Sequence, residues 1–280
     1  MTTTTPGAAV VTGAAGGLGR ALAAALHADG WRVLLTDVDA AAAADAAGPL
    51  GGWSRPLDVR DEAACAAVAA EAAGAPGGLG LWVNNAGILV TGPSWAHDAP
   101  TRRRVVEVNA LGAMNGTLAA VAVMRDQGHG HVLNVVSLAG LIAAPGETVY
   151  AASKHALLAF SLGTLSDLRM AGVRGVHVSC LCPDGIWTPM LHDKLDDPGA
   201  LASFTGALLT PERVAARAVR LARRPRPVVS LPRWRGAQVR LLDAYPRLAL
   251  ALTPVVRAAG RAGQRRQARR VRPEASPPRL

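Results

Sequence analysis

Short apolar runs alternate with longer Ala-rich segments through the first two-thirds of the chain. The apolar runs are nearly continuous, which is typical of strands buried on both faces of a parallel sheet. The Ala-rich segments are long enough for helices and have the matching composition. The predicted strands are 8–12, 32–36, 55–59, 81–84, 131–136, 176–181 and 228–231, and the predicted helices are 17–28, 38–47, 62–73, 101–125, 149–170 and 211–223.

This alternation predicts an α/β fold, a Rossmann-type doubly wound parallel sheet of about seven strands with helices on both faces. From Arg233 the composition changes, and prolines at 246 and 254 interrupt an otherwise apolar stretch. We therefore predict an α/β domain over residues 1–232 and a basic, Arg-rich C-terminal extension over residues 233–280. The extension is expected to be partly helical, with a disordered end.

Charge separates the same two regions. Residues 1–212 carry 12 Lys and Arg against 18 Asp and Glu, whereas residues 213–280 carry 18 Arg against 2 acids. Three interpretations of the basic region stay open: an amphipathic segment on an anionic membrane surface, a segment folded over the active site or a dimer partner, or an unstructured solubilising arm. Nucleic-acid binding is not expected, because the chain has no recognised nucleic-acid module.

The cysteines and the N-terminal residues indicate in which cellular compartment the protein is expected. The chain has three cysteines, Cys65, Cys180 and Cys182, and no two of them have the C-x-x-C spacing. Neither a disulfide framework nor a metal site is therefore expected. The N-terminus lacks the positive segment of a signal peptide, and we expect no stretch long and apolar enough to span a bilayer. A cytoplasmic location is expected, with membrane-peripheral association as the alternative.

A Gly-rich turn follows the first predicted strand and opens the first predicted helix. It reads Thr12-Gly13-Ala14-Ala15-Gly16-Gly17-Leu18-Gly19. Glycines let the backbone turn tightly and approach a pyrophosphate, which the helix N-terminus attracts with free N–H groups. We predict cofactor contacts at Gly13, Gly16, Gly17, Leu18 and Gly19.

Asp37 ends the second predicted strand. A carboxylate there would bind the adenosine-ribose hydroxyls of NAD and repel the 2′-phosphate of NADP. No Lys or Arg lies within residues 12–19 or directly after Asp37, so NAD is predicted over NADP. The alternative is that Asp37 only caps the following helix.

Taken together, further motifs resemble the short-chain dehydrogenase/reductase family over roughly residues 7–231. The turn matches T-G-x-x-x-G-x-G, residues 84–87 match N-N-A-G, and Asp58-Val59 matches a pair that contacts adenine. The resemblance implies a nicotinamide-dependent oxidoreductase that forms homo-dimers or homo-tetramers through its two long helices. It places Asn85, Ala86 and Gly87 at the nucleotide and Asn109, Ser137, Tyr150 and Lys154 at the catalytic positions.

The residues themselves support this chemistry. Tyr150 and Lys154 are four apart on a predicted helix and so share one face. A neighbouring ammonium and a positive nicotinamide ring are expected to lower the pKa of Tyr150, which then exchanges a proton with the substrate oxygen. Ser137 follows a predicted strand and would hold that oxygen. By resemblance, Lys154 also binds the nicotinamide ribose and Asn109 holds a water in a proton relay.

The loop after the sixth predicted strand reads Pro183-Asp184-Gly185-Ile186-Trp187-Thr188. The family usually has Pro-Gly here, so Asp184 departs from the pattern. We carry over Pro183, Ile186 and Thr188 as cofactor contacts. Apolar side chains in and near this loop favour an apolar substrate, such as a lipid, steroid, terpenoid or aromatic alcohol or ketone. The expected substrate contacts are Ser137, Leu138, Leu89, Trp187 and Met190.

Two other functions remain as alternatives. A non-catalytic dinucleotide sensor would be expected to lose the catalytic Tyr or Lys, and this chain keeps both Tyr150 and Lys154. A membrane-surface protein would act mainly through its basic tail, with turnover secondary.

Overall fold

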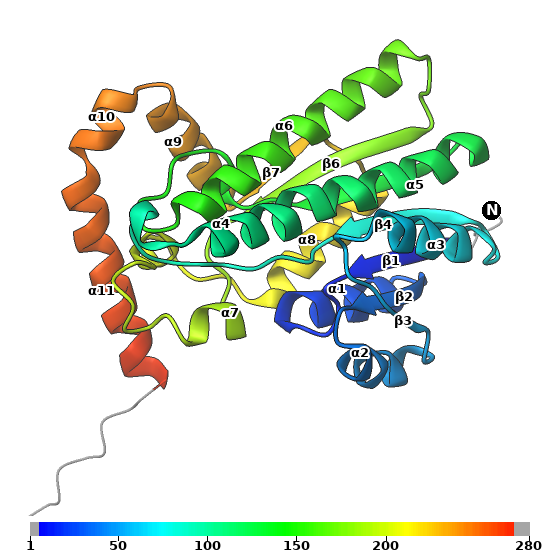
Figure 1. The fold of residues 1–280 in the computed structure, drawn as a ribbon, viewed down its shortest axis with the longest axis horizontal. Coiled ribbons are helices and arrows are strands. Elements are labelled where there is room, and N and C mark those ends of the chain that lie inside the picture. Colours follow the sequence, from blue (N-terminus) through cyan, green and yellow to red (C-terminus); the bar gives the residue numbers. More distant parts are fainter. Residues whose placement is uncertain (1–5, 272–280) are drawn as a thin grey trace, which may run out of the picture.

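The computed structural model describes residues 6–271, and its centre is a parallel sheet of seven strands (Figure 1). The strands are β1 (Ala8–Thr12), β2 (Arg32–Asp37), β3 (Ser54–Pro56), β4 (Leu79–Asn84), β5 (Gly130–Val135), β6 (Val176–Pro183) and β7 (Val228–Leu231). Their order in the sheet is β3-β2-β1-β4-β5-β6-β7. The order reverses between β1 and β4, and ligands bind beyond the carboxyl ends of the strands at such a point.

Helices cover both faces of the sheet. They are α1 (Gly17–Ala28), α2 (Ala40–Ala47), α3 (Glu62–Ala73), α4 (Ala99–Val106), α5 (Ala113–Gln127), α6 (Thr148–Met170), α7 (Pro189–His192) and α8 (Pro211–Arg223). Apolar residues of α1, α2 and α8 pack on one face, and those of α3, α5 and α6 pack on the other. This arrangement confirms the predicted fold class.

Two elements differ from the sequence prediction, and both differences lie near the cavity described below. Strand β3 ends at Pro56 rather than at Val59, because Leu57 and the two residues after it leave the sheet and line the cavity. The predicted helix over 101–125 is a longer run in which α4 and α5 are joined by a π-helical turn, Glu107–Gly112. Single π turns inside α-helices are frequent at functional sites.

The continuous helical run Ala99–Gln127 is, by length and composition alone, apolar enough to cross a membrane, contrary to our expectation. Its most apolar window has a mean hydropathy of 1.3, and half of that window is buried inside the protein. The buried side chains of α5 pack against the sheet beside those of β4 and β5. The hydropathy of this run therefore follows from its place in the core.

The C-terminal extension is helical as far as the structure describes it, and it stands along one side of the sheet domain (Figure 1). It comprises α9 (Arg233–Asp243), α10 (Pro246–Ala251) and α11 (Thr253–Val271). The two prolines that interrupt the sequence pattern lie in the first turns of α10 and α11, where no helical hydrogen bond is lost. The disorder expected at the end concerns residues 272–280, which lie outside the described part.

Helix α11 is docked on the short helical turn η5 (Leu201–Phe204). A Cβ atom on Gly260 would lie 2.3 Å from the Leu201 carbonyl oxygen, and one on Gly263 would lie 2.0 Å from that of Phe204. The buried Gln264 amide donates to the carbonyls of Lys194 at 2.9 Å and Asp197 at 2.7 Å. An unstructured arm is therefore excluded for α11.

Candidate active site

A cavity of about 950 Å³ opens at the carboxyl ends of the strands. One end lies at the Gly-rich turn between β1 and α1, and the other is walled by α9, α10 and α11. Most of the residues singled out from the sequence line it. They are Gly13, Gly16, Gly17, Leu18, Gly19, Asp37, Asp58, Val59, Asn85, Ala86, Gly87, Leu89, Ser137, Leu138, Tyr150, Lys154, Pro183, Ile186, Thr188 and Met190.

The Gly-rich turn has the shape of an anion cradle. Gly13 has a φ of +63°, and a Cβ on it would lie 2.8 Å from the Cα of Ala86. A Cβ on Gly19 would lie 2.1 Å from the Gly13 carbonyl oxygen. Gly16 faces open space, and as the N-cap of α1 it leaves that helix end without a side-chain cap. The turn therefore fits a pyrophosphate, which free N–H groups at a helix N-terminus attract.

Asn85 fixes the turn from the neighbouring strand end. Its side-chain amide donates to the carbonyls of Thr12 and Gly13, both at 3.0 Å, and its backbone N–H donates to the Thr12 hydroxyl at 3.1 Å. The residues after β4 thus support the cradle and also line the cavity beside it.

Asp37 reaches back from the end of β2 to the same turn. One carboxylate oxygen accepts the Ala15 N–H at 3.0 Å, and the other accepts the Asp39 N–H at 3.2 Å. The cap of α2 is Asp39, whose side chain accepts the Ala42 N–H. The interpretation of Asp37 as a mere helix cap is therefore wrong, and its carboxylate lines the cavity.

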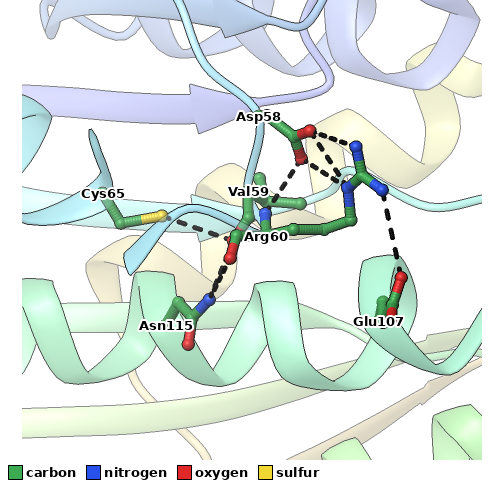
Figure 2. A network of polar contacts seen from close by, with 6 residues as sticks. All are labelled: Asp58, Val59, Arg60, Cys65, Glu107 and Asn115. Atoms are coloured by element: carbon green, nitrogen blue, oxygen red, sulfur yellow. Dashed lines mark hydrogen bonds and ion pairs between the residues drawn. The ribbon is translucent and has the colours of Figure 1, made fainter. Parts of the chain in front are cut away.

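Asp58 and Val59 lie at the adenine end of the cavity expected from the motifs, within a polar network (Figure 2). The Arg60 guanidinium binds Asp58 at 2.5 Å and approaches Glu107 at 3.9 Å. The hydrogen bond from Arg60 holds the pKa of Asp58 below its usual range. Asn115 donates to the Val59 carbonyl at 3.0 Å, which fixes the segment against α5.

Two cations lie at this end of the cavity, and neither was predicted from the sequence to line it. Arg60 and Arg104 both line the cavity wall. Arg60 is partly neutralised by its two acidic neighbours, Asp58 and Glu107.

Tyr150, Lys154 and Ser137 meet in the middle of the cavity. Tyr150 and Lys154 come from the first turns of α6, and the Lys154 ammonium lies 5.7 Å from the centre of the Tyr150 ring. The ammonium donates to the Val135 carbonyl at 2.9 Å, which anchors it against the end of β5.

Ser137 holds a strained backbone. Its φ of 147° and ψ of 161° belong to a region that only glycine adopts readily, and no other non-glycine residue in the range 6–271 has a positive φ. Such strain costs about 1–3 kcal/mol and clusters at functional sites. It places the Ser137 side chain at the N-cap of the short turn η4 (Leu138–Gly140), facing the cavity.

Burial dominates the protonation of this centre. It raises the pKa of Tyr150 above its ordinary value, Glu147 adds to this effect, and the Ser137 hydroxyl opposes it. Burial also lowers the pKa of Lys154 to about 8. A phenolate in a cavity walled by protein loses its hydration, so the lowering expected for the pKa of Tyr150 from Lys154 and the nicotinamide ring must overcome this effect and stays a prediction.

Asn109 lies behind this centre, in the π-helical turn, and is fully buried. Its amide donates to the Ile88 carbonyl at 2.9 Å and to the Ser153 hydroxyl at 3.1 Å, and its oxygen accepts the Ile88 N–H at 2.8 Å. It does not belong to the described cavity lining. These contacts brace α6 and the loop after β4, and a role in holding water stays a prediction.

Trp187 is not among the described residues that line the cavity, in contrast to the expected substrate contact. Its ring packs against His192 instead, with 4.3 Å between the ring centres. Backbone alternation in this loop turns Trp187 toward the α7 side, whereas Ile186 and Thr188 line the cavity.

Sequence analysis missed residues that long-range packing brings to the site. Asp184, noticed only as a departure, binds Arg235 of α9 at 3.0 Å, and Arg235 also donates to Thr205 at 2.9 Å. Glu147 lines the cavity one helical turn before Tyr150. The extension lies over the cavity, as one of the three interpretations of the basic region held, but the residues of its apolar wall were not named from the sequence. They are Val239, Leu242, Pro246, Ala249, Leu250, Leu252, Val255, Val256 and Ala259.

Comparisons with known proteins agree with this geometry. The family described as short chain dehydrogenase matches residues 7–199. The sex determination protein tasselseed-2 of Zea mays is 36% identical over 192 residues, which are 65% of this chain and only 56% of that protein. The 1-deoxy-11-beta-hydroxypentalenate dehydrogenase of Streptomyces avermitilis is 35% identical over 208 residues, 71% of this chain and 76% of that one.

A solved structure is similar over most of the molecule. It is a short chain dehydrogenase/reductase from Burkholderia phymatum in complex with NAD, with a TM-score of 0.78 and 29% identity. The similarity covers 89% of this chain and 97% of that one. With the fold, the cradle and the Tyr150 centre already in place, these matches show that the chain belongs to the short-chain dehydrogenase/reductase family of oxidoreductases.

Proposed function

We propose that this protein transfers a hydride between NAD and an apolar secondary alcohol or ketone, with Tyr150 as the general acid and base. The observation that carries the proposal is the shared cavity, which joins the anion cradle at one end to Tyr150, Lys154 and Ser137 in the middle. NAD bound at the cradle would supply the nicotinamide ring that accepts or donates the hydride.

Each residue of the centre has a distinct task. The Ser137 hydroxyl holds the substrate oxygen and stabilises developing negative charge on it. Tyr150 takes the alcohol proton during oxidation or gives one to the carbonyl during reduction. Lys154, anchored on the Val135 carbonyl, binds the ribose and, with the cationic ring of the bound cofactor, favours the phenolate that burial alone disfavours.

Asp37 supports NAD over NADP. Its carboxylate is fixed at the edge of the cradle, where it would accept hydrogen bonds from ribose hydroxyls and repel a 2′-phosphate. Two cations, Arg60 and Arg104, line the cavity at that end, and Asp58 already pairs with Arg60.

Apolar side chains support an apolar substrate. Leu89, Leu138 and Met190 line the cavity beside the catalytic centre, and the inner faces of α9, α10 and α11 close it with aliphatic groups. Pockets of this kind take up apolar ligands, and a few placed polar groups orient them.

Fluorescence titration of NADH and NADPH on wild type, Asp37→Ala and Asp39→Ala tests the cofactor assignment. Wild type should bind NADH more tightly, Asp37→Ala should lose most of that preference, and Asp39→Ala, a neighbouring helix cap, should keep it. Tighter NADPH binding by wild type would overturn the assignment. Tight NADH binding without turnover of any apolar alcohol or ketone would favour the non-catalytic dinucleotide sensor.

We further propose a homo-oligomer formed through the long helices. Exposed apolar side chains on α5 and α6 support this interface, among them Leu118, 49% exposed, and Leu162, 39% exposed. Light scattering after size exclusion should give a dimer or tetramer. Replacing both leucines with glutamate should give a monomer, and an unchanged mass would disprove this interface.

The outer face of the extension supports peripheral binding to an anionic membrane in the cytoplasm. Exposed Trp234, Leu241 and Leu248 alternate with Arg240 and Arg247, a pattern that lets apolar groups enter the headgroup region. Two copies of so basic a face would repel each other, which argues against self-association there.

Vesicle co-sedimentation tests this surface. Wild type should bind phosphatidylserine-containing vesicles and not phosphatidylcholine vesicles, and a Leu241→Glu, Leu248→Glu variant should lose binding. Met170→Glu, at an even more exposed apolar site on α6, serves as the control and should bind normally. Substitutions are preferred to truncation, because removing the extension also removes a wall of the cavity. Equal binding of all variants to the vesicles would disprove the proposal that this surface binds the membrane.

A further inference from the structure

A carboxyl group that the proposed mechanism does not use lies in the cavity wall. Glu147 is only 2% exposed, and it lines the cavity directly before α6. One of its oxygens, Oε1, accepts the Ser203 N–H at 3.1 Å. No hydrogen bond to the other oxygen, Oε2, is found among the described residues. Oε2 is not one of the fully buried unpaired side-chain atoms there, so it is accessible from the cavity.

A carboxyl group that is removed from water and keeps one oxygen without a hydrogen bond lowers the stability of the fold. Buried polar groups in folded proteins are therefore nearly always hydrogen-bonded. Burial raises the pKa of Glu147 to about 7, and the carboxylates of Asp197 and Asp184 add to this effect. Hydrogen bonding from the Ser203 hydroxyl and N–H opposes this effect but does not outweigh it. An incoming hydrogen-bond donor would supply a partner for Oε2.

No nearby cation serves that purpose in the described part of the chain. Arg235 is engaged by Asp184, Thr205 and Gln238. Lys154 donates to the Val135 carbonyl. Oε2 of Glu147, which lines the cavity, is therefore left to accept a hydrogen bond from a ligand that binds there.

Its position relative to the catalytic centre is fixed by the helix. Glu147 and Tyr150 are three residues apart at the start of α6, which puts both side chains on one side of that helix. Their charges also interact, since Glu147 contributes to raising the pKa of Tyr150. A substrate whose reacting oxygen lies at Tyr150 would bring its adjoining atoms close to Glu147.

We propose that Glu147 is a specificity-determining residue that accepts a hydrogen bond from a second hydroxyl group of the substrate. The preferred substrate is then an apolar ring system carrying two hydroxyls, or a hydroxyl and a ketone, rather than a mono-alcohol. This inference rests on the proposed function, because it assumes that the reacting carbon lies at Tyr150.

The test compares matched alcohols: cyclohexanol against the 1,2-, 1,3- and 1,4-cyclohexanediols, with NAD. Wild type should show a higher kcat/KM for at least one diol than for cyclohexanol. In Glu147→Gln and Glu147→Leu the ratio of these values should fall about tenfold or more, since a site built around a hydroxyl discriminates strongly against its absence. Glu62→Gln, an exposed carboxyl on α3, should keep the wild-type ratio.

A parallel loss of kcat/KM for every alcohol, with an unchanged ratio, would show that Glu147 only positions Tyr150 and would overturn the proposal. Thermal-shift titration of the same alcohols onto the NADH complex provides a readout that does not need turnover. Diol-selective stabilisation that Glu147→Gln abolishes would support Glu147 even if the hydride-transfer function failed. Equal shifts by mono-alcohol and diol in wild type would disprove it.

Discussion

The sheet domain and the C-terminal extension enclose one cavity, yet they contribute to it in opposite ways. The sheet domain brings polar and glycine residues from strand ends, and hydrogen bonds between neighbouring strand ends fix them, as at Asp37 and Asn85. The extension brings aliphatic side chains on helices held by a few distant contacts, as at Arg235 and Gln264. In the proposed function, the first region holds the cofactor and the reacting groups, and the second largely shapes the space for the substrate.

This contrast predicts that changes in the two regions affect different constants. Substitutions in the sheet domain should reduce kcat or cofactor binding. Substitutions in the extension should change KM for the alcohol while the affinity for NADH stays the same.

The largest effect is expected for Tyr150→Phe, which removes the proton donor and keeps the ring. Loss of a general acid and base should lower kcat by about 10²–10⁴-fold. The variant should bind NADH like wild type, because the cradle is untouched. Residual kcat within tenfold of wild type would show that another group transfers the proton.

The second largest effect is expected for Arg235→Met, because this substitution leaves the Asp184 carboxyl buried without its cation. The side chains of this pair are 15% and 7% exposed, and removing one partner of a buried pair costs on the order of 3 kcal/mol. The melting temperature should therefore fall, and Arg233→Met on the exposed side of α9 should leave it near the wild-type value.

A double-mutant cycle with Asp184→Asn isolates the interaction itself. The Asp184→Asn, Arg235→Met variant should be more stable than the sum of the single losses predicts. Simple additivity would show that the pair does not couple α9 to the loop after β6.

Gly263→Val should detach α11 from η5, since even a Cβ there would lie 2.0 Å from the Phe204 carbonyl oxygen. Overpacking of this kind costs about 1–3 kcal/mol. KM for apolar alcohols should rise while the Kd for NADH stays the same. Ala262→Val, on the exposed side of α11, is the control. A rise in the Kd for NADH would contradict the division between the two regions.

The smallest effect concerns pH. The pKa of Glu147 is raised to about 7, so the folded state holds a proton between roughly pH 4.5 and 7 that the unfolded chain has released. This group's contribution to stability is therefore present at low pH and is lost as the pH rises through 7. Glu147→Gln should raise the melting temperature by a few degrees at pH 8 and less at pH 5.5. An equal shift at both values would contradict a raised pKa.

Sequence patterns were sufficient to predict the sheet and to single out Ser137, Tyr150 and Lys154, which line one cavity, because both depend on local signals. The Gly-rich turn, the Asn85 motif and the spacing of Tyr150 and Lys154 each lie within one short stretch. The limits of β3 and the π-helical turn at Asn109 were missed, since packing against neighbouring elements decides them. Trp187 was misplaced for a similar reason, because its orientation depends on the fold of the loop after β6.

Residues of the extension were harder to assign, because nothing near Arg235 in the chain points to Asp184. The two are 51 positions apart and meet only when α9 packs beside the end of β6. Glu147 was overlooked for another reason: a lone acid before a helix is ordinarily a surface residue, and only its burial distinguishes it.

The docking of α11 also has a consequence for biosynthesis. The sheet domain can begin to fold as soon as β7 has left the ribosome, because domains fold largely from the N-terminus during translation. Gly260, Gly263 and Gln264 lie well after β7 in the chain and therefore emerge later than the sheet domain. The cofactor cradle is therefore complete on the nascent chain before the substrate cavity is closed, and a chain cut short within α11 would carry the catalytic residues without the wall that selects their substrate.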